Sequence, residues 1–375
     1  MKSGRGKRIW LAVLFFVLFG SNPQARAEEE RRQGYYTMVE AETGRIVCRT
    51  GLVIRPGDEY LTADNLRYRV RRVEGDTAYA EFRGREKLET ASAPRANWFG
   101  RLLGGLVAPG RRGAKKPVAI YHTHDDESYV PTDGTDSIQG RGGVVRVGEV
   151  LADWLRREGI PAVHSEAPHD PHDGMAYERS RRTAVELLRR NPAALLDIHR
   201  DAAPRQEYAE EIGGTGVTRI QIVLGRTNPN FKANEAFAKQ IKAAIDRKYP
   251  GLIKGIFYGA GKYNQDLSPR ALLLEFGAHT NARQSAERAA GIFARAAGGL
   301  LATPSRAALR GQNAGAWRAL LWILGAAVVG ALLFLFLNAS GLAEAGRNLG
   351  RFFRREFASA LGERRWRKIP GRKRE

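Results

Sequence analysis

The spacing of apolar residues changes near residue 117 and divides the chain into two kinds of structure. Upstream, short apolar runs between glycine- and proline-containing turns predict a small β-rich unit. Its expected strands are 35–40, 46–48, 60–62, 66–73 and 77–82. Downstream, apolar runs predict buried strands at 118–121, 162–165, 194–198, 218–224 and 271–276. Helical spacing of apolar positions predicts helices at 147–158, 177–190, 234–247 and 281–301.

Strands that alternate with helices are typical of an α/β fold with a mostly parallel sheet flanked by helices. We therefore expect an α/β domain at 117–303, with a separate β-rich domain at 28–95 before it. A linker rich in glycine and arginine connects them at 96–116. The β-rich unit has no cluster of histidine, aspartate or glutamate with catalytic spacing. We interpret it as an accessory or spacer domain.

Both ends of the chain carry features of export and membrane attachment. Residues 1–27 have a basic start, an apolar stretch at 9–19 and an Ala-Arg-Ala site, as in a cleavable signal peptide. An uncleaved anchor is the alternative. After a polar linker at 304–317, residues 318–337 predict a transmembrane helix, and the basic tail 338–375 should be cytoplasmic by the positive-inside rule. Both features place the body of the chain outside the plasma membrane.

The net charge of +21 first suggests a nucleic-acid partner, but its distribution argues against one. Residues 1–27 hold five basic and no acidic residues, and the tail holds eleven basic and four acidic residues. More than half of the net charge therefore lies at the ends, and the moderately basic middle suits any polyanionic surface. A single cysteine, Cys48, excludes an intrachain disulfide and a cysteine-based metal site. We expect Cys48 to be buried.

Three predicted strands of the α/β domain end in residues that can bind a metal or act as a base. The segments are I-Y-H-T-H-D-D-E-S-Y from Ile120, L-D-I-H-R-D from Leu196 and L-E-F-G-A-H from Leu274. Parallel strands bring their carboxyl ends to one edge of the sheet, so these residues should converge. A catalytic zinc needs three protein ligands, an open position and a nearby base. His122, Glu127 and His199 are the candidate ligands, with Glu275 as the base.

Other interpretations of these histidines remain open. A histidine at a strand end often only binds the backbone, and Asp125 and Asp126 suit a solvated loop. His164, His169 and His172 form a second cluster, but its proline-rich loop favours a surface segment, which we interpret as a lid or substrate rim.

The three segments together resemble the stage II sporulation protein P family of cell-wall hydrolases, which are related to zinc-dependent N-acetylmuramoyl-L-alanine amidases. The resemblance covers about residues 117–301, and the His-Thr-His-x-x-Glu-Ser segment is its most diagnostic part. It implies zinc binding by His122, Glu127 and His199, and a catalytic carboxylate at Glu275. Arg200 and Asp201 would orient substrate or ligands. His124 and His279 are further candidates for substrate binding or ligand support.

The same resemblance implies a peptidoglycan substrate and a partner similar to stage II sporulation protein D, a lytic transglycosylase, during engulfment. Cleavage of peptide cross-links is a further activity associated with the family. The chain departs from the family pattern in its predicted C-terminal span, because familiar members are anchored near the N-terminus. That difference concerns tethering and partner choice rather than the chemistry.

The leading hypothesis is thus a membrane-tethered zinc amidase of peptidoglycan. A wall-binding scaffold with a degenerate zinc site is the alternative, although every expected ligand and the base are present. A nucleic-acid binder is the weakest reading, because no basic and aromatic residues alternate along a binding face.

Overall fold

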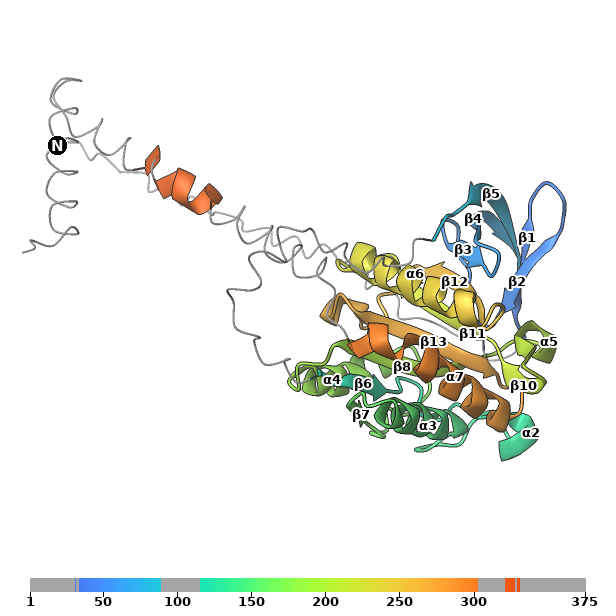
Figure 1. Ribbon diagram of the computed structural model, residues 1–375. Helices are drawn as coiled ribbons and strands as arrows, with labels where there is room; N and C mark the ends of the chain where they lie inside the picture. The colour runs from blue at the N-terminus through green and yellow to red at the C-terminus, as the bar shows by residue number, and fades with distance from the viewer. Residues whose placement is uncertain (1–30, 32–33, 89–114, 303–320, 328, 331–375) are drawn as a thin grey trace, which may run out of the picture. The chain divides into compact units, whose positions relative to one another are not determined.

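The computed structural model describes residue 31 and residues 34–88, 115–302, 321–327 and 329–330. The chain divides into two units, Met1–Pro304 and Ser305–Glu375. The first unit is built on one sheet of eleven strands, in the order β2-β1-β5-β4-β3-β12-β11-β13-β8-β6-β7. Figure 1 shows this sheet as the centre of the unit, with helices packed on it.

The N-terminal strands are part of this same sheet. They are β1 (Tyr36–Glu40), β2 (Ile46–Thr50), β3 (Glu59–Thr62), β4 (Leu66–Glu74) and β5 (Thr77–Arg85). Strand β3 pairs antiparallel with β12 (Ile253–Gly259), so backbone hydrogen bonds run without a break into the α/β part. The strands upstream of residue 117 were thus predicted at nearly the right places. The expected division into two domains differs from the structure, because the pairing with β12 makes one sheet of both parts.

The remaining strands form the α/β part of the sheet. They are β6 (Val118–Tyr121), β7 (Ala162–His164), β8 (Ala194–Asp201), β11 (Ile220–Gly225) and β13 (Ala271–Ala278). Strands β7, β6, β8 and β13 run parallel to one another, while β11 is antiparallel to β13 and parallel to β12. This part is therefore mostly parallel, as expected, and β6, β8 and β13 end at the same edge.

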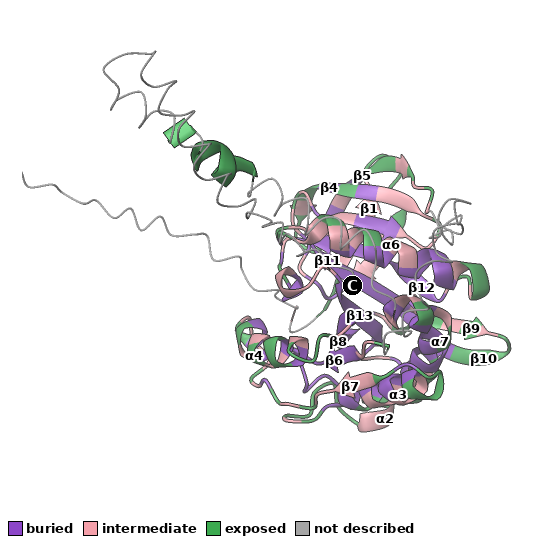
Figure 2. Ribbon diagram, turned by 60° about the vertical axis from the view of Figure 1, so that its left-hand side comes forward, coloured by how far each residue is buried: buried purple, intermediate pink, exposed green. Residues whose placement is uncertain are grey.

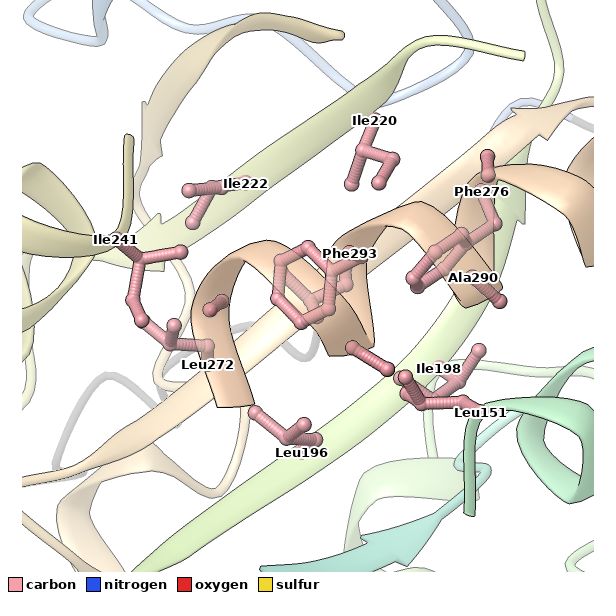
Figure 3. Packing of buried hydrophobic residues seen from close by; sticks show 14 of the residues in the cluster. Leu151, Leu196, Ile198, Ile220, Ile222, Ile241, Leu272, Phe276, Ala290 and Phe293 are labelled. Atoms are coloured by element: carbon pink, nitrogen blue, oxygen red, sulfur yellow. The ribbon is translucent and has the colours of Figure 1, made fainter. Parts of the chain in front are cut away.

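Three helices cover one face of the α/β part. They are α3 (Gly143–Arg157), α6 (Phe231–Lys248) and α7 (Arg283–Ala302). Figure 3 shows Phe293 of α7 among Leu196 and Ile198 of β8 and Leu272 and Phe276 of β13. Because side chains alternate across a strand, these even-numbered positions face the three helices and the odd-numbered positions face the other side.

Helix α4 (Ala176–Leu188) packs on that other side, where Ala184 and Leu187 form a cluster with Tyr121 and Leu195. Figure 2 shows the inner strands buried between the two helical layers. The odd-numbered residues near the ends of β8 and β13, among them His199 and Glu275, therefore lie on the α4 side.

Short elements complete the unit. They are the helices α2 (Val130–Asp133) and α5 (Arg205–Tyr208), the 3₁₀ turn η1 (Gln265–Leu267) and the hairpin of β9 (Ala209–Ile212) and β10 (Thr215–Thr218). The sequence pattern missed all of these, and it also missed β12, whose apolar run is interrupted by Lys254 and Gly255.

The predicted signal peptide 1–27 and the basic tail 338–375 lie outside the described residues, as do most of the linkers 96–116 and 304–317. Of the predicted transmembrane helix 318–337, the structure describes helical residues 321–327 and 329–330. Within the described parts of the chain, no helix has both the length and the hydrophobicity that crossing a bilayer requires.

Candidate metal centre

Three buried side chains meet where β6 and β8 end. They are His124, Glu127 and His199, whose potential ligand atoms all lie within 4.8 Å of one another. Glu127 Oε1 is 3.2 Å from Nδ1 of His124 and 3.2 Å from Nδ1 of His199. One carboxylate oxygen therefore faces two imidazole nitrogens from different strand ends.

This arrangement fits a metal ion. Ligand atoms at about 2.0–2.1 Å from a tetrahedral zinc lie roughly 3.3 Å apart, close to the spacing found here. Two imidazoles and a carboxylate are also a ligand set that catalytic zinc sites use. In addition, Nε2 of His124 is buried without a hydrogen-bond partner among the described residues, so no contact on that side of the ring competes with a metal at Nδ1.

The loop after β6 brings Glu127 back to the strand ends. The start of α3 holds this loop, because Val144 N donates to Glu127 O at 3.0 Å and Gly142 N donates to Asp125 O at 2.6 Å. Gly142 is required there, since a Cβ at this position would collide with the backbone of Asp126 and Glu127. The second oxygen of the carboxylate, Glu127 Oε2, accepts the backbone N–H of Arg200 at 2.9 Å.

His199 is held from behind by a second carboxylate. Asp197 Oδ1 lies 3.0 Å from His199 Nε2, on the ring edge opposite to Glu127. Thr123 fixes Asp197 in turn, with its N–H 2.8 Å from Oδ1 and its hydroxyl 2.6 Å from Oδ2. A carboxylate behind a metal-binding histidine sets the tautomer and the orientation of the ring.

His122, predicted as a ligand, is not part of this cluster. Its Nδ1 lies 2.9 Å from the carbonyl oxygen of Ile198, to which it donates, and its Nε2 lies 2.8 Å from Nε2 of His164. Burial and the neighbouring His164 lower the pKa of His122 to about 3. The ring fits against α3 only because Gly148 has no side chain. In the described structure His124, and not His122, lies in the cluster with Glu127 and His199.

Glu275, the predicted base, lies beside His199 in the sheet. The two residues are register partners on the parallel strands β13 and β8, and their side chains point to the same side. Glu275 is buried, with 1% of its surface exposed. The structure therefore places Glu275 beside His199 in the sheet, on the same side.

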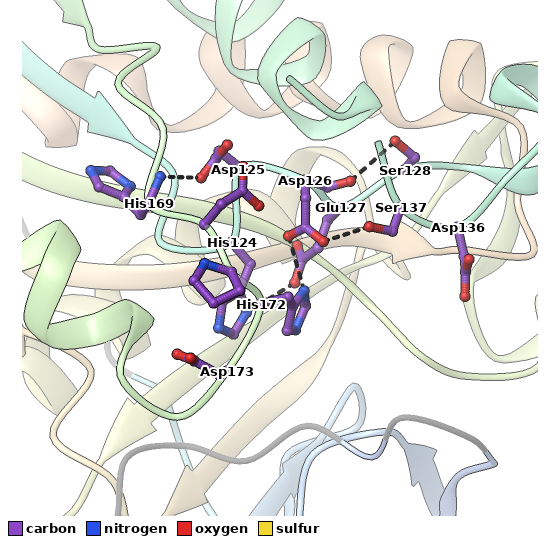
Figure 4. A network of polar contacts seen from close by, with 12 residues as sticks. His124, Asp125, Asp126, Glu127, Ser128, Asp136, Ser137, His169, His172 and Asp173 are labelled. Atoms are coloured by element: carbon purple, nitrogen blue, oxygen red, sulfur yellow. Dashed lines mark hydrogen bonds and ion pairs between the residues drawn. The ribbon is translucent and has the colours of Figure 1, made fainter. Parts of the chain in front are cut away.

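The segment that carries the second group of histidines, His164, His169 and His172, covers the candidate metal cluster. The His172 ring stacks on the His124 ring, with centroids 3.9 Å apart, and His172 Nδ1 is 3.0 Å from Asp126 Oδ1 (Figure 4). His169 is buried and its N–H donates to Asp125 Oδ1 at 2.5 Å. His164 instead contacts His122. Asp125 and Asp126 are thus buried in this network rather than solvated.

The other predicted site residues surround the cluster. Arg200 and His279 line a cavity of about 920 Å³ next to His124, together with His172. Arg200 also donates from Nη2 to the backbone oxygen of Asp136 at 3.2 Å. Asp201 is turned away from the ligands, and its carboxylate accepts hydrogen bonds from Gly51 N and Tyr208 Oη, each at 2.7 Å.

The charges of the cluster depend on one another. Burial opposes a charge on His199, but the carboxylates of Asp197 and Glu127 outweigh it and raise the pKa of His199 well above its usual value. Burial likewise opposes a charge on Glu127, yet His199 and Arg200 hold its pKa well below the usual range. For His124, burial dominates and lowers the pKa. Without a metal, Glu127 and His199 thus each favour the charged form of the other.

Asp197 is the residue that the sequence analysis missed. It lies two positions before His199, and alternation along a strand puts both side chains on the same side. A carboxylate at that spacing within the L-D-I-H segment was a usable signal. His172 was predicted to lie only in a lid or substrate rim, because the sequence of a proline-rich loop does not show that its ring stacks on His124.

Comparison with known proteins agrees with the resemblance in the sequence. The family model for stage II sporulation protein P (SpoIIP) matches residues 72–298. Stage II sporulation protein P of Bacillus subtilis (strain 168) is 33% identical over 201 residues, which are 48% of this chain and 50% of that protein. The chain thus spans about half the length of this curated relative.

Two solved structures show a weaker likeness. The N-acetylmuramoyl-L-alanine amidase AmiC2 of Nostoc punctiforme is 14% identical with a TM-score of 0.32, covering 49% of this chain and 96% of its own. The CwlD amidase of Clostridioides difficile, in complex with the GerS lipoprotein, is 10% identical with a TM-score of 0.28, covering 47% and 94%. The likeness to both is too low to carry an argument. The family match, in contrast, covers more than half of the residues, and the chain belongs to the stage II sporulation protein P family.

Proposed function

We propose that this protein is a zinc-dependent N-acetylmuramoyl-L-alanine amidase that degrades septal peptidoglycan during sporulation. The observation that carries the proposal is the buried cluster of His124, Glu127 and His199 beside a cavity, in a member of this family. A catalytically inactive wall-binding scaffold is the alternative, and the intact ligand set argues against it.

The proposed roles follow from the contacts. His124, Glu127 and His199 would hold zinc, which would acidify a water molecule and polarise the scissile carbonyl. Glu275 would take a proton from the attacking water and pass it to the leaving L-alanine amine. Asp197 holds the His199 ring, and Arg200 fixes Glu127 through its backbone while its side chain reaches the cavity.

We also propose the cellular setting from the sequence. The signal-like residues 1–27 and the apolar stretch 318–337 support a protein tethered in the plasma membrane, with its catalytic unit outside the cytoplasm. The family resemblance supports a partner similar to stage II sporulation protein D, and it extends the proposal to peptide cross-links as a second substrate bond.

Mass spectrometry of the products released from purified peptidoglycan tests the activity. Stem peptides with a new L-alanine amino terminus are expected with zinc and should disappear with a chelator. Glu275→Gln should remove the products while zinc remains bound. Glu211→Gln, the same change at an exposed residue of the β9–β10 hairpin, should leave activity unchanged. Wall binding without any product, even on glycan strands cut beforehand by a transglycosylase, would favour the scaffold.

A further inference from the structure

The cavity beside the metal cluster has one wall that does not come from the α/β part. Arg31, Gly34, Tyr35 and Val53 line it, and all four belong to the N-terminal β segment, which here means residue 31 and residues 34–88. The sequence analysis gave this segment no role in the site. At about 920 Å³ the cavity is near the upper end of the roughly 300–1,000 Å³ typical of small-molecule sites, so it has room for more than the scissile amide.

The end of β8, which carries His199, holds this wall in place. Gly51 N donates to Asp201 Oδ1 at 2.7 Å, and Gly51 O accepts the N–H of Arg31 at 3.0 Å. Gly51 also packs directly on the residue after Asp201, because a Cβ on Gly51 would lie 2.5 Å from the Cβ of Ala202. The wall is therefore placed by the same strand end that presents a ligand.

A second set of contacts fixes β2 next to the site. Arg49 Nη1 and Glu207 Oε1 are 3.0 Å apart, and Lys254 Nζ donates to Arg49 O at 2.7 Å. Lys254 belongs to β12, the strand that joins the N-terminal strands to the rest of the sheet. The segment is thus fastened at Arg49 as well as at Gly51.

The chemistry of the wall is mostly uncharged. Gly34, Tyr35 and Val53 line the cavity together with the uncharged Ala202, Ala203 and Pro204, whereas its charged residues other than Arg31 come from the α/β part. Arg31 forms an ion pair with Asp76, so its charge is largely compensated. Tyr35 is 39% exposed, an aromatic side chain on the cavity surface. An aromatic ring on such a surface suits the apolar face of a sugar, since the ring offers a large apolar contact area.

We propose that the N-terminal β segment is the second wall of the substrate cleft and binds the glycan strand of the substrate, with Tyr35 as the platform for a sugar ring. The inference rests on the proposed function for the identity of the polymer. It gives the segment a role in substrate selection: long glycan strands that carry stem peptides should be preferred over isolated muramoyl peptides.

Kinetics on two substrates test the proposal in the full-length protein. Tyr35→Ala should raise KM about 3- to 10-fold for soluble glycan strands with stem peptides, because one aromatic contact is lost, and leave kcat nearly unchanged. With a muramoyl dipeptide, which has no further sugar to reach the wall, KM should not change. Tyr35→Phe keeps the ring and should behave like the parent protein. Phe82→Ala removes an exposed aromatic ring from the same segment, away from the cavity lining, and should have no effect.

A second pair of variants tests the position of the N-terminal β segment and leaves the Tyr35 ring in place. Gly51→Ala should push the segment away from Ala202 and raise KM for glycan strands as Tyr35→Ala does. Gly216→Ala is the matched control, because a Cβ there meets no atom within 4 Å. If Tyr35→Ala raised KM equally for the dipeptide, or raised it for neither substrate, the proposal that the N-terminal β segment binds the glycan strand would be wrong.

Binding separates this proposal from the proposed function. Calorimetry with soluble glycan strands in the Glu275→Gln background requires no turnover. Weaker binding after Tyr35→Ala supports the wall even if the parent protein releases no stem peptides, whereas unchanged binding refutes it even if the amidase activity is present.

Discussion

Asp197 and His199 lie two positions apart on β8, and Asp197 Oδ1 is 3.0 Å from His199 Nε2 on the ring edge opposite to Glu127. The contact fixes which nitrogen of His199 is offered to a metal. We expect Asp197→Asn to weaken zinc binding about 10- to 100-fold, the usual effect of losing a carboxylate behind a histidine ligand.

Competition with a chromophoric chelator measures that change. Asp136→Asn makes the same substitution at an exposed residue of the cavity lining, outside the ligand cluster, and should leave the affinity unchanged. Equal affinities for Asp197→Asn and the parent protein would show that the contact does not support the metal.

A second prediction concerns the choice between two histidines of the His-Thr-His segment. His124→Ala should abolish stoichiometric zinc binding, because it removes one of the three clustered side chains. His122→Ala should keep zinc but destabilise the fold by about 1–3 kcal/mol, since it leaves the buried carbonyl of Ile198 without its donor.

Zinc content by mass spectrometry, together with denaturant unfolding, distinguishes the two variants. Both should be compared at equal fractions of folded protein, because His122 is fully enclosed. If His122→Ala loses the metal and His124→Ala keeps it, the ligand assignment from the structure is wrong.

The pH dependence of the metal-free protein gives a third prediction. The pKa of His199 is raised by Asp197 and Glu127 in the folded state, so its stabilising contribution is complete below about pH 6.5, the unfolded value. It is lost as pH rises through the higher folded pKa. The stabilising contribution of Glu127 depends on pH in the opposite direction. It is present above about pH 4.3, the unfolded value, and is lost as pH falls through the lowered pKa of the folded state.

Zinc must displace the proton of His199, so binding should release protons and become tighter as pH rises. We expect the zinc-induced increase in Tm to be larger at about pH 8.5 than at about pH 6. Calorimetry in buffers of different ionisation enthalpy counts the released protons directly. An affinity that does not depend on pH would mean that His199 is already neutral before the metal binds.

The sequence predicted the strand ends of the site but not every side chain at them. Glu127 and His199 come together, and Glu275 lies beside His199 in the sheet, because β6, β8 and β13 run parallel, and their apolar runs were clear in the pattern. Within the His-Thr-His segment, the position directly after the apolar run and the family resemblance favoured His122, and His124 was kept as a further candidate. Strand β6 ends at Tyr121, and the following turn brings His124 to the cluster instead.

The division into domains could not be read from the sequence for a different reason. The pairing of β3 with β12 joins segments that are nearly 200 residues apart in the chain, through backbone hydrogen bonds and through packing of the Tyr60 ring on Gly255. Backbone pairing leaves no residue pattern of its own. Strand β12 carries a lysine and two glycines, so its sequence resembles a turn more than a buried strand. Because β12 was not predicted, no strand was available to pair with β3, and the N-terminal strands were interpreted as a separate domain.

Cys48 provides a test of the N-terminal part of the core. It lies on β2 with 2% of its surface exposed, as expected, and burial raises the pKa of its thiol to about 12. The thiolate is the reactive form, so native Cys48 should react with a thiol reagent only through transient opening of the fold. Opened fractions of about 10⁻³ or less imply labelling at least roughly a thousandfold slower than in urea. Absorbance after addition of an aromatic disulfide measures both rates. Labelling of the native protein at the rate seen in urea would show that β2 does not pack as part of the sheet.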